Sequence, residues 1–227
     1  MKVSWWKDHN NFGDWLTPAL LKHFGFEVEW AEPWDADFMG AGSCLDGLTA
    51  EKPYKGILWG TGMMDRSKKP DISQAKVVAL RGQFSKAHCH SDCSILGDPG
   101  LLANVLVKES IPVNHDVGFI AHWNDKETEV ADAYKIKVTN DVTTVIKDAM
   151  SCKAIISTSL HGLILADALG LPRMWLYTDA NPGEGFKFYD YQSVFSIPLK
   201  MNVWQKMPRK EVAAIKKDLL SALKKLK

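Results

Sequence analysis

The sequence predicts an α/β protein made of two Rossmann-like halves with a cleft between them. Four successive apolar segments each open into a glycine-containing turn, namely "FMGAGS", "LWGTG", "ALRG" and "LGDPG". Buried parallel strands have this apolar character, and ligands collect at their carboxyl ends. The pattern of strands and helices then begins again near residues 107–115. The 227 residues suffice for two small domains, and we place these at residues 1–107 and 108–227.

The first half is expected to open with the strand "KVSWW", followed by the loop "KDHNNFGDWL". Thr17 and Pro18 predict the start of a helix, because threonine is a common N-cap and proline suits the first turn. The segment "ALLKHFG" completes this helix, and Gly25 can close it. Further strands are expected at "EVEWA", "DADFMGAGS", "GILWGTGM", "KVVALRG" and "CSILGDPG".

The second half repeats this alternation. Strands are expected at "VGFIAHW", "YKIKVT", "KAIISTS" and "RMWLYT", and helices at "TTVIKDAMSC" and "HGLILADALG". The tail "PRKEVAAIKKDLLSALKKLK" carries apolar residues three or four positions apart, at Val212, Ile215, Leu219, Leu223 and Leu226. This spacing predicts an amphipathic C-terminal helix that packs on a neighbouring sheet or domain.

Composition excludes several classes of protein. The 28 basic and 27 acidic residues leave a net charge of +1, so we expect no electrostatic attraction to nucleic acid. No apolar run reaches the roughly 18 residues of a membrane span, and "MKVSWWKDHNN" lacks the apolar region of a secretory signal. The four cysteines do not form a disulfide framework by spacing or density. These observations favour a reduced, cytoplasmic protein.

The segment "HCHSDC" contains two types of zinc ligand, at His88, Cys89, His90 and Cys93. The residues are crowded, however, and no second Cys or His pair follows at the usual distance. We therefore favour a surface loop over a zinc site, and we expect neither a metal nor a cofactor.

His161 has the most informative position of the polar residues. It follows the predicted strand "KAIISTS" and lies near the start of the next helix, where backbone N–H groups and the helix dipole attract anions. A histidine there can donate a hydrogen bond to a phosphate or a proton near neutral pH. The alternative is a capping histidine with a structural role.

The segment "ISTSLHGLILADALGLP" resembles the most recognisable part of the polysaccharide pyruvyl transferase family, in which a His-Gly pair opens a helix. Other segments resemble family motifs in the same order, and the resemblance spans nearly the whole chain. These segments are "NNFGDWLTPAL", "LRGQFS", "LGDPGLL", "VGFIAHW" and, as in the branch that modifies exopolysaccharides such as succinoglycan, "FKFYDYQSVF".

The resemblance implies a GT-B-like fold and a reaction. Members of the family transfer pyruvate from phosphoenolpyruvate to two hydroxyls of a sugar, which forms a cyclic ketal and releases phosphate. The acceptor here would be a sugar, or a lipid-linked oligosaccharide, of a bacterial cell-surface polymer. Phosphoenolpyruvate would serve as donor substrate, with no cofactor. Peripheral membrane contact and oligomeric state stay open.

The candidate catalytic residue is His161, as the proton donor. Arg81 is the first choice to bind the anionic donor, because its guanidinium can hold an oxyanion pair. The candidate substrate-binding residues are Asn11, Gly13, Asp14, Arg81, Gly82, Ser85, Asp98, Ser157, Ser159, Leu160, Gly162, Lys187 and Asp190. Structural alternatives exist for four of them: a helix-entry cap for Asp14, a turn residue for Asp98, and a solvated ion pair for Lys187 with Asp190.

The chain departs from the family pattern in two ways. Many members have arginine before the Leu-His pair, where this chain has Ser159, so Arg81, Arg173 or Lys187 would have to supply the charge. The chain is also short for the family. Two alternative functions follow: a GT-B glycosyltransferase that uses a nucleotide sugar, and a non-catalytic saccharide-binding relative. Tryptophans near strand ends, among them Trp6 and Trp123, could stack on sugars, although core packing explains most tryptophans.

Overall fold

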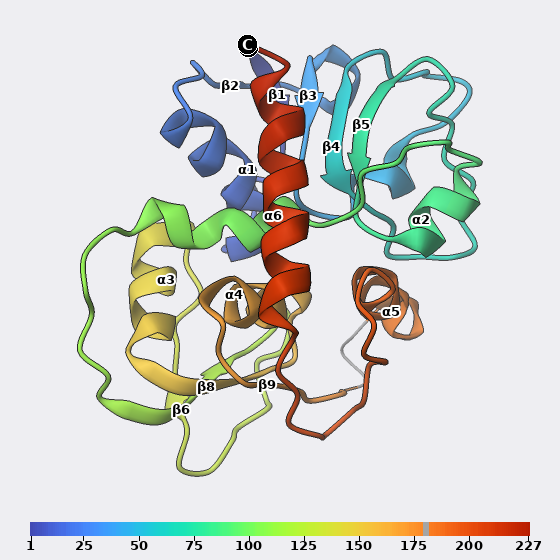
Figure 1. Ribbon diagram of the computed structural model, residues 1–227. Coiled ribbons are helices and arrows are strands. Elements are labelled where there is room, and N and C mark those ends of the chain that lie inside the picture. The colour runs from blue at the N-terminus through green and yellow to red at the C-terminus, as the bar shows by residue number, and fades with distance from the viewer. Residues whose placement is uncertain (179–181) are drawn as a thin grey trace.

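The computed structural model describes residues 1–178 and 182–227 and contains two parallel β-sheets (Figure 1). The first sheet has the strand order β2-β1-β3-β4-β5 and the second β7-β6-β8-β9. Every paired strand in both sheets is parallel to its neighbour. The strands are β1 Lys2–Ser4, β2 Glu29–Trp30, β3 Phe38–Met39, β4 Ile57–Thr61, β5 Lys76–Leu80, β6 His115–Ile120, β7 Tyr134–Lys135, β8 Cys152–Ser157 and β9 Arg173–Trp175. The α/β class is confirmed, and the two sheets are consistent with two Rossmann-like halves.

Helices connect and cover these strands. The α-helices are α1 Phe12–His23, α2 Gln83–His88, α3 Val142–Met150, α4 Leu160–Leu169, α5 Phe186–Gln192 and α6 Arg209–Lys224, and the 3₁₀ helices are η1 Pro33–Asp35, η2 Cys44–Gly47, η3 Pro99–Leu106 and η4 Pro182–Gly185. Asp141 caps α3, since its carboxylate accepts hydrogen bonds from the backbone N–H groups of Thr143 and Thr144. Gly170, with φ of 70°, ends α4 in the left-handed conformation that glycine adopts without strain.

Helix α1 begins at Phe12, so the prediction that it begins at Thr17 and Pro18 is wrong. Pro18 lies inside the helix, where it has no N–H to donate to the carbonyl of Asp14. The helix extends past this local signal because its first turns are packed: Phe12 and Leu16 are buried, and α1 contacts η3 and α3. Tertiary packing outweighs the helix-start signal here and places Asp14 in the first helical turn.

The expected strand at "CSILGDPG" is also wrong. This segment joins the first sheet only through a single bridge between Leu96 and Leu80. At Gly97 the backbone takes φ of 146°, and an added Cβ would overlap Ile215 of α6. The close approach of α6 and this sharp change of direction leave no room for a longer strand. The chain turns instead into η3, which Asp98 caps by accepting a 2.8 Å hydrogen bond from the backbone N–H of Gly100.

The last helix, α6, contacts both halves of the chain (Figure 1). The indole Nε1 of Trp59 in β4 donates a 3.1 Å hydrogen bond to the carbonyl of Leu219. Lys216 Nζ donates one of 2.8 Å to the carbonyl of Ala168 in α4. Val212 and Leu219 are buried in these contacts. Within the described residues, no helix combines the length and the apolar content that crossing a membrane requires.

Candidate functional site

A cavity of ≈ 320 Å³ is lined by loops that follow strands of both sheets. Ligands of parallel α/β sheets collect at such edges, and this volume lies near the lower end of the roughly 300–1,000 Å³ typical of small-molecule sites. The residues that line it are Trp6, Asn11, Asp14, Gly42, Ser43, Cys44, Met64, His122, Trp123, Asn124, Ser159, Leu160, His161 and Lys187.

The His161 side chain is held between two fixed neighbours in the first turn of α4. A Cβ at position 13 would overlap the imidazole, so only glycine there allows the ring to lie against α1. On its other side, Nε2 of His161 lies 3.6 Å from Oδ2 of Asp98. Neither of these buried atoms has a hydrogen-bond partner among the described residues. The ring is therefore fixed at the cavity wall with one nitrogen turned towards a carboxylate.

Two hydroxyl side chains fix the loops that carry this wall. Ser157 Oγ donates a 2.7 Å hydrogen bond to the carbonyl of Ile120 and accepts one of 2.9 Å from the N–H of Ser159. Thr158 Oγ1 accepts a 2.8 Å hydrogen bond from the N–H of His122. The loops that follow β6 and β8 are thereby joined, which brings His122 and His161 to the same cavity.

Burial changes the protonation of three groups in this cavity. Burial raises the pKa of Asp14 to about 6, although the charges of His161 and Lys187 oppose the shift. Burial and the Arg81 charge lower the pKa of Lys187 to about 8, and Asp14 opposes that shift. The Lys187 Nζ lies 3.2 Å from Nε2 of His122, and burial together with Lys187 lowers the pKa of His122 to about 4. A lysine, a carboxyl group and two imidazoles thus line one cavity that is partly shielded from water.

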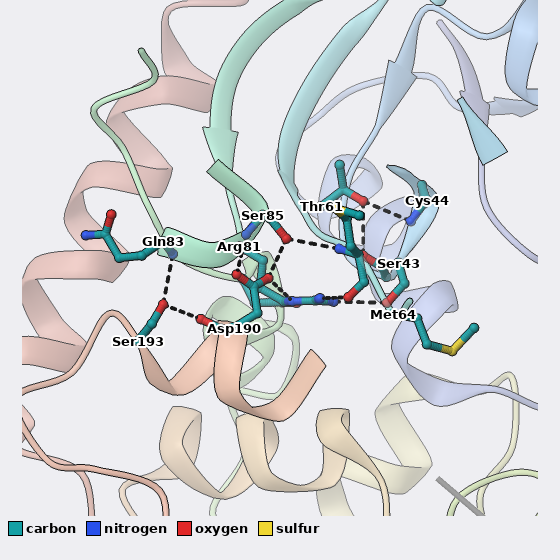
Figure 2. A network of polar contacts seen from close by, with 12 residues as sticks. Ser43, Cys44, Thr61, Met64, Arg81, Gln83, Ser85, Asp190 and Ser193 are labelled. Carbon is teal, nitrogen blue, oxygen red and sulfur yellow. Dashed lines mark hydrogen bonds and ion pairs between the residues drawn. The ribbon is translucent and has the colours of Figure 1, made fainter. Parts of the chain in front are cut away.

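Arg81 lies behind the cavity wall in a buried network (Figure 2). Its Nε donates a 3.0 Å hydrogen bond to Oδ2 of Asp190, its Nη1 one of 3.0 Å to Oγ of Ser43, and its Nη2 bonds the carbonyl of Met63. Asp190 also accepts hydrogen bonds of 2.8 Å from the N–H and 2.6 Å from the hydroxyl of Ser85. The guanidinium of Arg81 is occupied by protein partners and supports Ser43, which lines the cavity.

The polysaccharide pyruvyl transferase family model matches residues 6–180 of this chain. The match begins at Trp6 and includes His161, and it spans well over half of the sequence. The chain belongs to the polysaccharide pyruvyl transferase family. Lys187 lines the cavity and lies outside the matched range, whereas the other described lining residues lie within it.

Curated relatives of this pyruvyl transferase family member are longer than the chain. It is 34% identical over 160 residues to the uncharacterized protein L143 of Acanthamoeba polyphaga mimivirus, a match covering 62% of this chain and 55% of that one. It is 24% identical over 215 residues to the succinoglycan biosynthesis protein ExoV of Rhizobium meliloti (strain 1021), covering 87% of this chain and 66% of the relative. The chain therefore spans less than two thirds of each.

A solved structure with a similar fold is that of a functionally uncharacterized protein from Klebsiella pneumoniae subsp. pneumoniae NTUH-K2044. The TM-score is 0.50 with 13% sequence identity, and the match covers 84% of this chain and 87% of the other. At this identity the likeness concerns the fold alone.

The structure places the candidate residues of this family member in three groups. Six line the cavity: Asn11, Asp14, Ser159, Leu160, His161 and Lys187. Four form or adjoin the buried network behind it: Arg81, Gly82, Ser85 and Asp190. The remaining four support the histidine and its loop: Gly13, Asp98, Ser157 and Gly162. Gly162 belongs there because a Cβ at this position would overlap the Ser157 hydroxyl.

Several cavity residues were not among the candidates. They are Trp6, Gly42, Ser43, Cys44, Met64, His122, Trp123 and Asn124. The run "HWN" at 122–124 comes two residues after the apolar strand β6. Polar residues that follow a parallel strand lie at the sheet edge where ligands bind, so this run could have pointed to His122. Cys44 adds no nucleophile, since burial and the Asp14 charge raise the pKa of its thiol to about 12.

The histidine and cysteine loop at 88–93 lies apart from this site. His88 Nε2 donates a 2.7 Å hydrogen bond to the carbonyl of Arg66. In the described ranges 1–178 and 182–227, no group of three or more His, Cys, Asp or Glu side chains could hold a metal ion.

Proposed function

We propose that this protein transfers the pyruvyl group of phosphoenolpyruvate to two hydroxyls of a saccharide, forming a cyclic ketal. The observation that carries the proposal is the placement of His161 and Lys187 on one cavity lined from both sheets. The family membership supports this reaction class, and the distant likeness to a succinoglycan biosynthesis protein supports a cell-surface saccharide as acceptor. We also propose a GT-B-like arrangement of the halves, a lipid-linked acceptor and a cytoplasmic location.

The donor needs two sites for anions, since it carries a carboxylate and a phosphate. Lys187 supplies the positive charge in the cavity that Ser159 does not supply. The backbone N–H groups of the first turn of α4, which begins at Leu160, supply the second site. Arg81 contributes at longer range, through its charge and through Ser43.

The transfer moves two protons from the acceptor hydroxyls to the donor, one to its methylene carbon and one to the phosphate that leaves. A proton adds to the methylene carbon of phosphoenolpyruvate, and a sugar hydroxyl attacks the adjacent carbon and loses its own proton. The bond from that carbon to the phosphate oxygen then breaks and phosphate leaves with a proton. The second hydroxyl attacks the same carbon and loses its proton, which closes the ketal. His161 donates the proton that adds to the methylene carbon. Asp98 positions the imidazole, since its Oδ2 lies 3.6 Å from Nε2 of His161. Asp14 accepts the proton of the attacking hydroxyl.

The direct test measures phosphate release from phosphoenolpyruvate with a panel of saccharide acceptors. We expect release that depends on both the donor and an acceptor. Phosphoenolpyruvate should also raise the thermal midpoint of the protein, whereas a nucleoside diphosphate should not. Stabilisation by the nucleotide alone would favour a glycosyltransferase. Saccharide binding without phosphate release would favour a non-catalytic relative.

Replacing Lys187 with glutamine should weaken donor binding. A charge-assisted hydrogen bond contributes about 1.5–3 kcal/mol, so we expect KM for phosphoenolpyruvate to rise about 10–100-fold. The variant should not lose stability, because the pKa of Lys187 is lower in the folded protein than its ordinary value, and folding therefore disfavours the charged form below pH 8. Initial rates and thermal unfolding at pH 7 check both parts, and an unchanged KM would contradict the assignment.

The pH dependence of the rate should be bell-shaped. Asp14 must be deprotonated to accept a proton, which occurs above its pKa of about 6. Lys187 must be protonated to bind an anion, which occurs below its pKa of about 8. We expect kcat/KM for phosphoenolpyruvate to be highest between these values. In Lys187→Arg the contribution of Lys187 to the alkaline limb should disappear, because arginine stays charged, so the limb should change its position. An alkaline limb that is unchanged in this variant would assign it to another group, such as the proton donor His161.

A further inference from the structure

A second cavity lies beside the first and shares two residues with it. It measures ≈ 460 Å³ and is lined by residues that follow β1, β2 and β3. Trp6 and Cys44 line both cavities, so the two cavities adjoin at these residues. The remaining lining residues include Trp5, Trp30 and the charged side chains of Lys7, Asp8 and Glu32.

Two of its indole rings are held in place. The Nε1 of Trp30 donates a 3.0 Å hydrogen bond to the carbonyl of Trp5. Trp6 packs edge-on against Trp123, with ring centroids 5.0 Å apart and an interplanar angle of 89°. His9 stacks on Trp123 at 4.5 Å. Flat rings that are already fixed lose little entropy when a ligand stacks on them, and the apolar C–H face of a pyranose ring suits such a surface.

The charges in this cavity select against an anionic ligand. Among the described residues that line it, Lys7 is the one cation, and its Nζ lies 3.4 Å from the centroid of the Trp30 ring. Asp8 and Glu32 give the cavity two carboxylates that can accept hydrogen bonds from hydroxyl groups. A phosphate or a nucleotide would meet net negative charge, whereas a neutral polyhydroxylated molecule meets acceptors and aromatic faces. Because Lys7 is exposed and has a flexible stem, a sugar ring can take its place over the indole.

We infer that this second cavity is an acceptor subsite for neutral sugar residues next to the one that receives the pyruvyl group. The inference rests on the proposed function, since it assigns the donor to the first cavity. Trp30 provides the stacking surface of the subsite, and Trp6 marks its junction with the donor site. The protein should accordingly prefer an oligosaccharide to a monosaccharide.

The test compares phosphate release with methyl glycosides of glucose, galactose and mannose and with the matching β-linked disaccharides. The full chain should show a kcat/KM at least tenfold higher for a disaccharide than for its monosaccharide. Trp30→Ala should remove this preference. Trp34→Ala is the matched control, since Trp34 is 53% exposed and lines neither cavity, and it should keep the preference. If Trp30→Ala does not fold, Trp30→Leu retains apolar bulk without the flat ring.

Binding of the same disaccharides, followed by saturation-transfer NMR without phosphoenolpyruvate, separates this inference from the proposed function. Binding that weakens in Trp30→Ala, with no phosphate release from any acceptor, would support the subsite and overturn pyruvyl transfer. Phosphate release with equal preference in the parent protein and Trp30→Ala would overturn the subsite alone. Neither binding nor release would overturn both.

Discussion

Replacing His161 with glutamine should abolish most phosphate release from phosphoenolpyruvate. The imidazole is the proton donor proposed here, and a positioned general acid typically contributes about 10²–10⁴-fold to the rate. Glutamine retains a polar side chain in the space between Gly13 and Asp98, but it cannot exchange a proton at neutral pH. We therefore expect kcat to fall by about 10²–10⁴-fold, measured as phosphate release at saturating donor.

Donor binding provides the control for this variant. Lys187 and the first turn of α4 remain in place, so phosphoenolpyruvate should still raise the thermal midpoint of His161→Gln. A variant that binds the donor and does not turn it over would assign the imidazole to the chemical step. A kcat within tenfold of the parent protein would contradict that role, and His161 would then be a residue that caps α4.

The position of His161 could be predicted because it depends on local sequence. An apolar strand, "KAIISTS", is followed by a helix, and the junction of the two lies at the sheet edge where ligands bind. Ser159 and Leu160, at the same junction, also line the cavity, as does Asp14, which was expected in the loop before the first helix. The predicted start of α1 is wrong, because packing of the residues before Pro18 extends the helix towards its N-terminus and leaves Pro18 inside it.

The location of Arg81 could not be predicted from its neighbours in the sequence. An arginine after a strand is equally suited to hold a ligand or a buried carboxylate. Asp190 decides between these two roles. It lies 109 residues later in the chain and accepts a hydrogen bond from the Arg81 guanidinium. His122 was missed for a related reason: it is held at the cavity by Thr158, which follows the neighbouring strand β8 and accepts a hydrogen bond from the backbone N–H of His122. Contacts between distant segments decide both cases.

Replacing Asp190 with alanine should destabilise the protein more than any surface substitution. Both side chains of the Arg81–Asp190 pair are fully buried, and removing one partner of such a pair costs about 3–5 kcal/mol because the other charge is left uncompensated. For a chain of this length, each kcal/mol lowers the thermal midpoint by roughly 2–4 °C, so we expect a decrease of about 6–20 °C. Thermal unfolding at pH 7 measures it. Asp116→Ala is the matched control, since the Lys153–Asp116 pair is largely exposed and its loss should leave the midpoint nearly unchanged.

The double variant Arg81→Met with Asp190→Leu distinguishes the lost charge balance from lost packing. Both buried charges are absent from it, so most of the stability lost in Asp190→Ala should return. Activity should not return to the same extent, because the double variant removes the 3.0 Å hydrogen bond from Arg81 to Ser43 that supports the cavity wall. A double variant as unstable as Asp190→Ala would show that the hydrogen bonds from Ser85 to Asp190, rather than the ion pair, hold this part of the fold.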